Sequence, residues 1–145
     1  MPEFELSLNR DLPADPARVF QLWADAEHRK NWWCPRGLRC ADFTHDFRVG
    51  GTWQARLEGT ETGKSYWMGG RYLAIEEPAR LEFSFAWLED GTTPGRESVI
   101  SVTLESSKGG TRQVFRQSAF ETAEARDAHA MGWGECLDRL VESLS

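Results

Sequence analysis

His45 and Tyr72 are the two side chains of this sequence whose types could carry acid or base chemistry inside a fold. His45 shares strand parity with Phe43 and Phe47, so the imidazole faces inward if those two rings do. Inside a dry pocket, an imidazole or a phenol could orient a polar ligand group or transfer a proton. A hydrogen-bonded histidine in the core or at its rim is the competing interpretation. Both residues are therefore candidate catalytic and ligand-orienting groups.

Tryptophan is unusually frequent, with 7 among 145 residues. Aromatic side chains are the usual lining of apolar ligand sites, although buried rings also serve as plain core packing. Most of these tryptophans fall on segments that would surround an interface between a sheet and a helix. The residues expected to line a ligand pocket there are Trp33, His45, Trp53, Tyr72, Phe85, Trp87, Met131 and Trp133.

The cysteines and histidines show no spacing typical of a metal site. They are Cys34, Cys40 and Cys136 with His28, His45 and His129. An odd number of separated cysteines favours reduced thiols over a disulfide framework, and C-x-x-C and H-x-x-x-H pairs are missing. His129 precedes Cys136 by about two helical turns, which argues against a Cys-His dyad. We predict neither a metal site nor a cofactor, since G-x-S-x-G, G-x-G-x-x-G and Walker A motifs are also missing.

The charge pattern excludes several classes of partner. The formal net charge is −6 and the pI is near 5.1, with lysines and arginines scattered, so the basic footprint of a nucleic-acid-binding protein is missing. Anionic membrane surfaces are poor partners for the same reason. No stretch approaches the roughly 18 apolar residues of a spanning helix, and the N-terminus lacks a basic and apolar leader. We expect a cytoplasmic protein that inserts into no membrane.

The elements that must position these side chains begin with a strand and two short helices. Residues 3–10 alternate apolar and polar side chains, the period of an antiparallel strand with one solvated face. Asp15 then supplies a helix N-cap, followed by Pro16 at the first helical position. Residues 25–33 predict a second short helix, capped by Asp25 and ended by a proline.

From residue 38 to residue 120 the sequence alternates strands with glycine-rich turns. Such spacing predicts a meander of about six strands joined by tight hairpins. Segments 81–87 and 98–104 each alternate apolar and polar residues, so each strand buries one face. Before the glycine pair that follows Val49, Asp46 and Arg48 lie two residues apart on the face opposite the histidine. They predict a structural ion pair.

The last segment, residues 122–144, predicts an amphipathic helix that covers the apolar face of the sheet. Its apolar stripe consists of Trp133, Leu137, Leu140, Val141 and Leu144. Gly132 and Gly134 flank the tryptophan, and each costs about 1 kcal/mol in a helix interior unless close approach of the sheet or of a ligand offsets it. Together the elements predict one α+β domain spanning residues 1–145. Its curved antiparallel sheet of about six to seven strands surrounds a long C-terminal helix.

Several local motifs occur in the order found in a known family. They are Val19-Phe20 with Trp23, Trp32-Trp33-Cys34-Pro35, Asp46-Phe47-Arg48-Val49-Gly50-Gly51, Gly70-Arg71-Tyr72, Pro78 with Arg80-Leu81 and Phe83, Gly109-Gly110-Thr111, and Gly132-Trp133. On these motifs the chain resembles the START-like (SRPBCC) helix-grip superfamily, and within it the heat-shock-protein-90 ATPase activator-like domains. The resemblance covers nearly the whole chain. Cys34 stands where the family usually has glycine, which adds a side chain near the expected pocket entrance.

The resemblance implies a helix-grip fold with a cavity between the sheet and the last helix, but no particular reaction. Members use this grip to bind lipids, hormones and polyketides, to cyclise substrates or to contact a chaperone. The predicted function is binding of a small apolar or aromatic molecule. The alternatives are a cyclase, dehydratase or hydrolase with His45 or Tyr72 as acid or base, and an interaction protein of the chaperone-activator type. An exposed strand such as 97–106 could support a homodimer.

Overall fold

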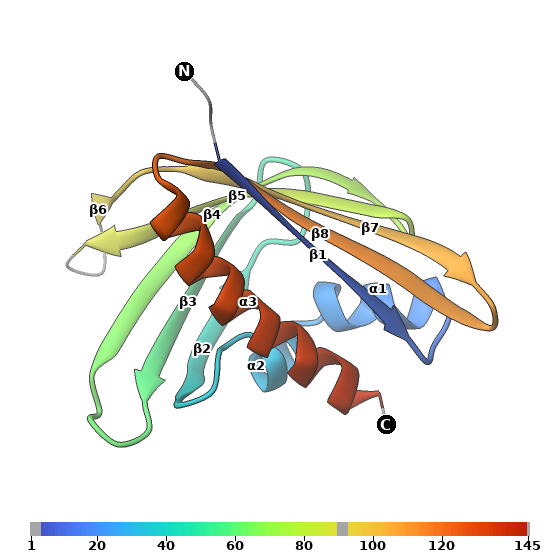
Figure 1. Cartoon of the computed structure of the whole chain (residues 1–145), viewed down its shortest axis with the longest axis horizontal. Helices are drawn as coiled ribbons and strands as arrows, with labels where there is room; N and C mark the ends of the chain where they lie inside the picture. The colour runs from blue at the N-terminus through green and yellow to red at the C-terminus, as the bar shows by residue number, and fades with distance from the viewer. Residues whose placement is uncertain (1–3, 90–92, 145) are drawn as a thin grey trace.

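A computed structural model of the chain describes residues 4–89 and 93–144 (Figure 1). The strands are β1 (Phe4–Leu12), β2 (Leu38–His45), β3 (Thr52–Gly59), β4 (Ser65–Glu76), β5 (Arg80–Glu89), β6 (Thr93–Pro94), β7 (Ser98–Ser107) and β8 (Gly110–Phe120). The helices are α1 (Pro16–Ala24), α2 (Ala26–Trp32) and α3 (Ala123–Ser143). One of the predicted glycine-rich turns, at Asp90-Gly91, lies outside the described residues. Within those residues, no helix is long and apolar enough to cross a membrane.

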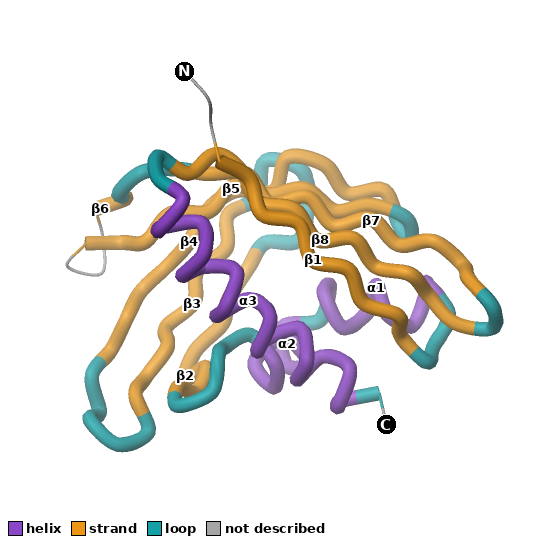
Figure 2. Tube along the Cα trace, in the orientation of Figure 1, coloured by secondary structure: helices purple, strands orange, loops and turns teal. Residues whose placement is uncertain are grey.

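Seven strands form one antiparallel sheet in the order β1-β8-β7-β5-β4-β3-β2, and the short β6 pairs with β5 beside this path. The sheet curls around α3, which runs diagonally across its concave side (Figure 1). Helix α1 lies on the same side, below β7 and β8, and α2 packs against α3 and β2 (Figure 2). The predicted α+β fold, with a curved antiparallel sheet around a long C-terminal helix, is therefore confirmed.

The three helices begin where the sequence places an N-cap. The side chains of Asp15 and Thr122 each accept a hydrogen bond from the backbone N–H three residues later, at 2.9 Å and 3.0 Å. Asp25 accepts one from the backbone N–H of Glu27 at 2.9 Å. Each cap satisfies a donor that the first helical turn leaves unpaired. The predicted positions of all three helices are confirmed. They could be predicted because a helix N-cap acts on residues next to it in the sequence.

The strands bury the faces that their alternation predicts. In β7 every second residue from Ser98 to Leu104 is buried, and in β5 the side chains of Leu81, Phe83 and Phe85 are buried. Trp87 continues this face of β5 but is 40% exposed. Opposite the sheet, the stripe of α3 buries Trp133, Leu137 and Leu140. The core therefore lies between the concave face of the sheet and α3, and Trp87 marks a place where this cover is incomplete.

The edges of the sheet are β1 and β2. The segment 97–106, predicted to be exposed and able to pair with a second copy, forms most of β7 instead. This strand is hydrogen-bonded to β5 on one side and to β8 on the other. Its ladder is already occupied, so the predicted homodimer contact through this strand is wrong. Strand order depends on contacts between distant segments, which local alternation does not encode.

The turn that leads into β3 contains the predicted ion pair. Arg48 Nε lies 2.6 Å from Asp46 Oδ2, and both side chains are mostly exposed. An exposed pair contributes only about 0–1 kcal/mol, so its effect is on local geometry and not on chemistry. A side chain at Gly51 would clash with the carbonyl oxygen of Asp46, which explains the glycine at that position.

Candidate functional site

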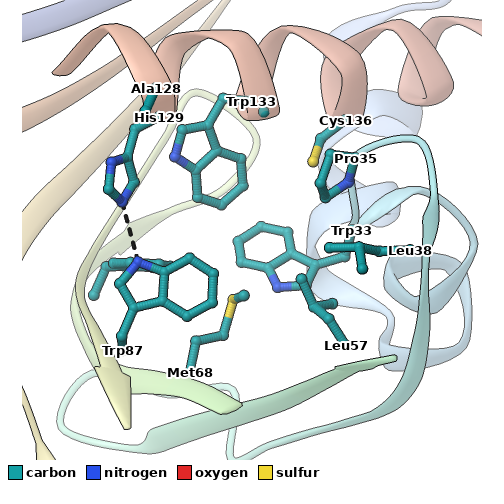
Figure 3. Close-up of a pocket in the computed structure, with 12 residues that line it drawn as sticks. Trp33, Pro35, Leu38, Leu57, Met68, Trp87, Ala128, His129, Trp133 and Cys136 are labelled. Atoms are coloured by element: carbon teal, nitrogen blue, oxygen red, sulfur yellow. Dashed lines mark hydrogen bonds between the residues drawn. The ribbon is translucent and has the colours of Figure 1, made fainter. Parts of the chain in front are cut away.

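A cavity of about 250 Å³ lies between α3 and the concave face of the sheet (Figure 3). We call it the inner cavity. Its lining consists of Trp33, Pro35, Leu38, Leu57, Met68, Phe85, Trp87, Ala128, His129, Gly132, Trp133 and Cys136. None of these twelve residues carries a carboxylate, ammonium or guanidinium group. The inner cavity is therefore an apolar site whose side chains come from helix, sheet and loop.

Helix α3 supplies one wall of the inner cavity. Its contributing residues are spaced as one helical face, at positions 128, 129, 132, 133 and 136. A Cβ added at Gly132 would meet no other atom within 4 Å, whereas one at Gly134 would lie 3.7 Å from Arg10 Nη2. Close approach of the sheet is thus not the reason for Gly132. The missing side chain at this position instead leaves space inside the cavity.

Two tryptophans stand face to edge in the interior. The ring centroids of Trp33 and Trp133 are 4.9 Å apart with an interplanar angle of 65°. The Nε1–H of Trp133 donates to Gln117 Oε1 at 2.7 Å, which fixes its ring. The Nε1–H of Trp33 is buried and has no hydrogen-bond partner among the described residues. The ring of Trp33 therefore lines the cavity, while its indole nitrogen is covered by surrounding atoms.

A hydrogen bond between β5 and α3 closes one side of the inner cavity (Figure 3). The Nε1–H of Trp87 donates to Nε2 of His129 at 3.1 Å. Nδ1 of His129 lies 2.8 Å from the backbone oxygen of Ala125, so the ring proton is on Nδ1. The ring of His129 is thereby held by a hydrogen bond at each of its two nitrogens.

The thiol in the cavity is not activated. Cys136 is buried, and burial raises the pKa of its thiol, with the nearby Cys34 adding to the shift. His129 lines the same cavity, but neither of its ring nitrogens is free to accept a proton from the thiol. A nucleophilic cysteine needs a lowered pKa or an available base, and Cys136 has neither. The described residues also contain no group of three or more His, Cys, Asp or Glu that could hold a metal ion.

Four of the eight residues expected to contact a ligand lie together in this lining. They are Trp33, Phe85, Trp87 and Trp133. Met131 does not: its side chain is 72% exposed. Two residues along a helix correspond to a rotation of about 200°, so Met131 points away from Trp133. The expectation that Met131 lines the pocket is therefore wrong, and the helical geometry explains why.

Trp53, His45 and Tyr72 face inward but do not line the inner cavity. Trp53 packs behind Trp33 at a centroid distance of 5.5 Å, and its Nε1–H donates to the backbone oxygen of Ser84 at 3.0 Å. Nδ1 of His45 lies 2.6 Å from the hydroxyl of Tyr72. Strand parity identified their face correctly, but parity says nothing about position along the strand. None of the three is therefore part of the lining of the inner cavity, and their contact with a ligand stays a prediction.

Arg29 of α2 is fully buried beside Tyr72, which in turn contacts His45. We call these three residues the Arg29 cluster. Its Nη1 donates to the backbone oxygen of Trp23 at 2.6 Å and to the hydroxyl of Tyr72 at 3.3 Å. Its Nε and Nη2 have no partner among the described residues. The guanidinium carbon lies 4.3 Å from the ring centroid of Trp33 and 4.6 Å from that of Phe43. Burial lowers the pKa of Arg29, and aromatic faces provide most of its surroundings.

The contacts of Arg29 fix the protonation of His45. The guanidinium occupies one acceptor site of the Tyr72 hydroxyl, which leaves its O–H free to donate to Nδ1 of a neutral His45 at 2.6 Å. Burial, and then the charge of Arg29, lower the pKa of His45. Burial raises the pKa of Tyr72, while the guanidinium acts in the opposite direction. The cluster is therefore built around a neutral histidine and a neutral tyrosine.

Acid should destabilise the fold through His45. In the unfolded chain this histidine takes up a proton as pH falls through about 6.5, whereas the folded state resists protonation to lower pH. The unfolded state then binds more protons, so the free energy of unfolding decreases from about pH 6.5 down to the lowered pKa. Urea unfolding between neutral and mildly acidic pH should show a weaker decrease for His45→Asn. An equal decrease in both proteins would contradict this role of His45.

Sequence reasoning missed the aliphatic and helical parts of the lining. Leu38, Leu57 and Met68 come from three strands whose inward positions were recognisable, but their meeting point depends on sheet register. His129 and Gly132 carried a usable signal, because both lie on the α3 face that contains Trp133. The hydrogen bond of His129 with Trp87 joins residues 42 positions apart, so no local sequence pattern indicates it.

A sequence profile of the Activator of Hsp90 ATPase homolog 1-like protein family matches residues 13–145. No curated protein matches the chain significantly. Among solved structures, the AHSA1 protein from Silicibacter pomeroyi is 27% identical, with a TM-score of 0.87 and coverage of 97% of each chain. A protein from Rhizobium leguminosarum is 28% identical, with a TM-score of 0.82 and coverage of 99% of this chain and 95% of that one.

A protein from Chromobacterium violaceum shares 24% identity and a TM-score of 0.88, covering 99% of this chain and 98% of its own. At this identity the likeness concerns the fold alone. The family profile spans α1 to the end of α3, the elements that enclose both the inner cavity and the Arg29 cluster. The chain therefore belongs to the Activator of Hsp90 ATPase homolog 1-like family, and its fold is that of the helix-grip superfamily.

Proposed function

We propose that the protein binds a small, uncharged aromatic or apolar molecule in the inner cavity. The observation that carries the proposal is the lining itself, which combines four aromatic side chains with aliphatic and sulfur-containing ones and contains no formally charged group. A ligand charge placed there would lose its hydration without gaining an ionic partner. A neutral molecule gains from burial against the rings.

The size of the inner cavity supports a one- or two-ring ligand. Its volume is about 250 Å³. For comparison, an engineered apolar protein cavity of about 150 Å³ binds benzene. Indole and naphthol are suitable probes because both are neutral, aromatic and small.

Ligand binding should raise the thermal unfolding midpoint. A molecule that binds only the folded state at about 100 times its Kd stabilises that state by about 2.7 kcal/mol. We expect indole or naphthol to raise the midpoint of the wild-type protein and of Met131→Leu alike, because Met131 lies outside the lining. The absence of any shift with a panel of neutral aromatic probes would overturn the proposed function.

A further inference from the structure

A second cavity lies directly beside the inner cavity. This outer cavity has a volume of about 230 Å³, and Phe85, Trp87 and His129 line both spaces. The partition between them is therefore formed by side chains and not by backbone. The partition includes the hydrogen bond from Trp87 to His129. The ring centroid of Phe85 lies 5.5 Å from that of Trp87. Figure 3 shows this bond at one side of the inner cavity.

The two halves of the partition differ in how firmly they are held. His129 is fixed by its second hydrogen bond, to the backbone oxygen of Ala125 in its own helix. Trp87 is 40% exposed, and its indole N–H donates a hydrogen bond to His129. Turning Trp87 outward breaks one neutral hydrogen bond and ring contacts with Phe85 and His129, whereas turning His129 breaks two hydrogen bonds. Trp87 is therefore the half that can swing outward and connect the two spaces.

The outer cavity is also largely apolar, but unlike the inner one its lining includes charged side chains, Arg96 and Glu121. Polar side chains line it, including Arg96, Ser98, Gln117 and Thr122. Gln117 is buried and donates to Ser98 Oγ at 2.8 Å, so these two groups form a fixed polar floor. The guanidinium of Arg96 lies at the rim, where its Nη1 is 2.8 Å from a carboxylate oxygen of Glu121. The outer cavity thus offers a cation that already holds an exposed carboxylate.

Resting on the proposed function of the inner cavity, we propose that the two spaces form one composite site for an elongated molecule with a carboxylate head group. The apolar body occupies the inner cavity, and the head group reaches Arg96, where it replaces Glu121. Entry requires Trp87 to turn away from His129. An arginine–carboxylate contact suits this position because its geometry is directional and it needs no second buried charge. The ligand class is therefore an aryl-alkanoic acid or a similar amphiphile, of which the inner cavity holds only the uncharged apolar part.

The length of the alkyl chain of the ligand provides the first test. Phenylacetate, phenylbutyrate and phenylhexanoate are titrated calorimetrically beside the alcohols of the same lengths. We expect the short acid to bind no more tightly than its alcohol, because its carboxylate cannot pass the partition. The longest acid should bind up to about fivefold more tightly than its alcohol, the upper range for a mostly exposed ion pair. Equal affinities of acids and alcohols at every length would overturn the composite site.

Substitutions at the rim provide the second test. Arg96→Gln should remove this advantage of the long acid and should leave the alcohols unaffected. Glu121→Gln should act in the opposite direction, because it removes the carboxylate that competes for Arg96. Arg39→Gln is the matched control, since Arg39 is a mostly exposed arginine paired with Glu58 and lines neither cavity. An unchanged affinity in Arg96→Gln would contradict the proposed head-group contact.

Indole and the long acids test the two proposals separately. Indole needs only the inner cavity, so indole binding without any preference for long acids sustains the function and overturns the composite site. If neither indole nor any acid binds, both are overturned. Trp87→Phe keeps a ring but loses the bond to His129, so phenylhexanoate should associate faster with it in stopped-flow measurements. An unchanged association rate would contradict the role of Trp87 as the moving half.

Discussion

Replacing Gly132 with leucine is expected to abolish indole binding while leaving the protein folded and at least as stable. Gly132 lies in the interior of α3 and in the lining of the inner cavity, and a Cβ there would touch nothing within 4 Å. A leucine side chain therefore enters free space and fills a large part of the volume that a ligand would need. The loss in affinity should exceed tenfold, or about 1.4 kcal/mol.

The effect on stability should have the opposite sign. Glycine in a helix interior costs about 1 kcal/mol relative to alanine, so Gly132→Leu and Gly132→Ala should both raise the free energy of unfolding. Gly134→Ala is the matched control: it makes the same change two residues later, its Cβ has an ordinary contact with Arg10, and it lies outside the lining. Binding should be intact in that variant. Indole affinity retained in Gly132→Leu would show that ligands do not use the inner cavity.

Truncation of Arg29 to alanine is expected to cost about 3–5 kcal/mol of stability, the range seen when large buried side chains are removed. Arg29 is fully buried, and its removal leaves a void among aromatic rings. It also leaves the backbone oxygen of Trp23 without the donor that now lies 2.6 Å away. Urea unfolding monitored by circular dichroism measures the loss.

Arg29→Met separates the volume of this side chain from its charge. Methionine fills a similar space, and its loss of hydrogen bonds and aromatic contacts is offset by removal of a buried guanidinium that lacks two of its hydrogen-bond partners. We expect a stability within about 1.5 kcal/mol of the wild type. A methionine variant as unstable as the alanine variant would mean that the polar contacts of Arg29, and not its volume, hold the cluster together.

Local signals predicted much of this fold because they are physically local. The caps Asp15, Asp25 and Thr122 act within three residues, so helix starts could be read directly from the sequence. Alternation likewise identified the buried faces of β5 and β7. The position of β7 inside the sheet could not be recovered in this way, because its two partners come from different parts of the chain.

The candidate site was less predictable than the fold. Aromatic frequency indicated a ring-lined cavity, yet it could not separate Trp33, which lines the cavity, from Trp53, which lies behind it. Arg29 escaped notice because charged residues are almost never fully buried without a partner, and nothing in its neighbours along the chain marks it as an exception. The Trp87–His129 bond required knowledge of where β5 ends relative to α3.

The contacts among the tryptophans have an optical consequence. Trp33 stands 4.9–6.1 Å, centroid to centroid, from each of Trp23, Trp32, Trp53 and Trp133. Indoles this close exchange electronic excitation before they emit, so light absorbed by any one of the five is shared by the group. The near-ultraviolet circular dichroism should then report one coupled chromophore. A molecule that touches only Trp33 or Trp133 would alter the emission of rings it never meets.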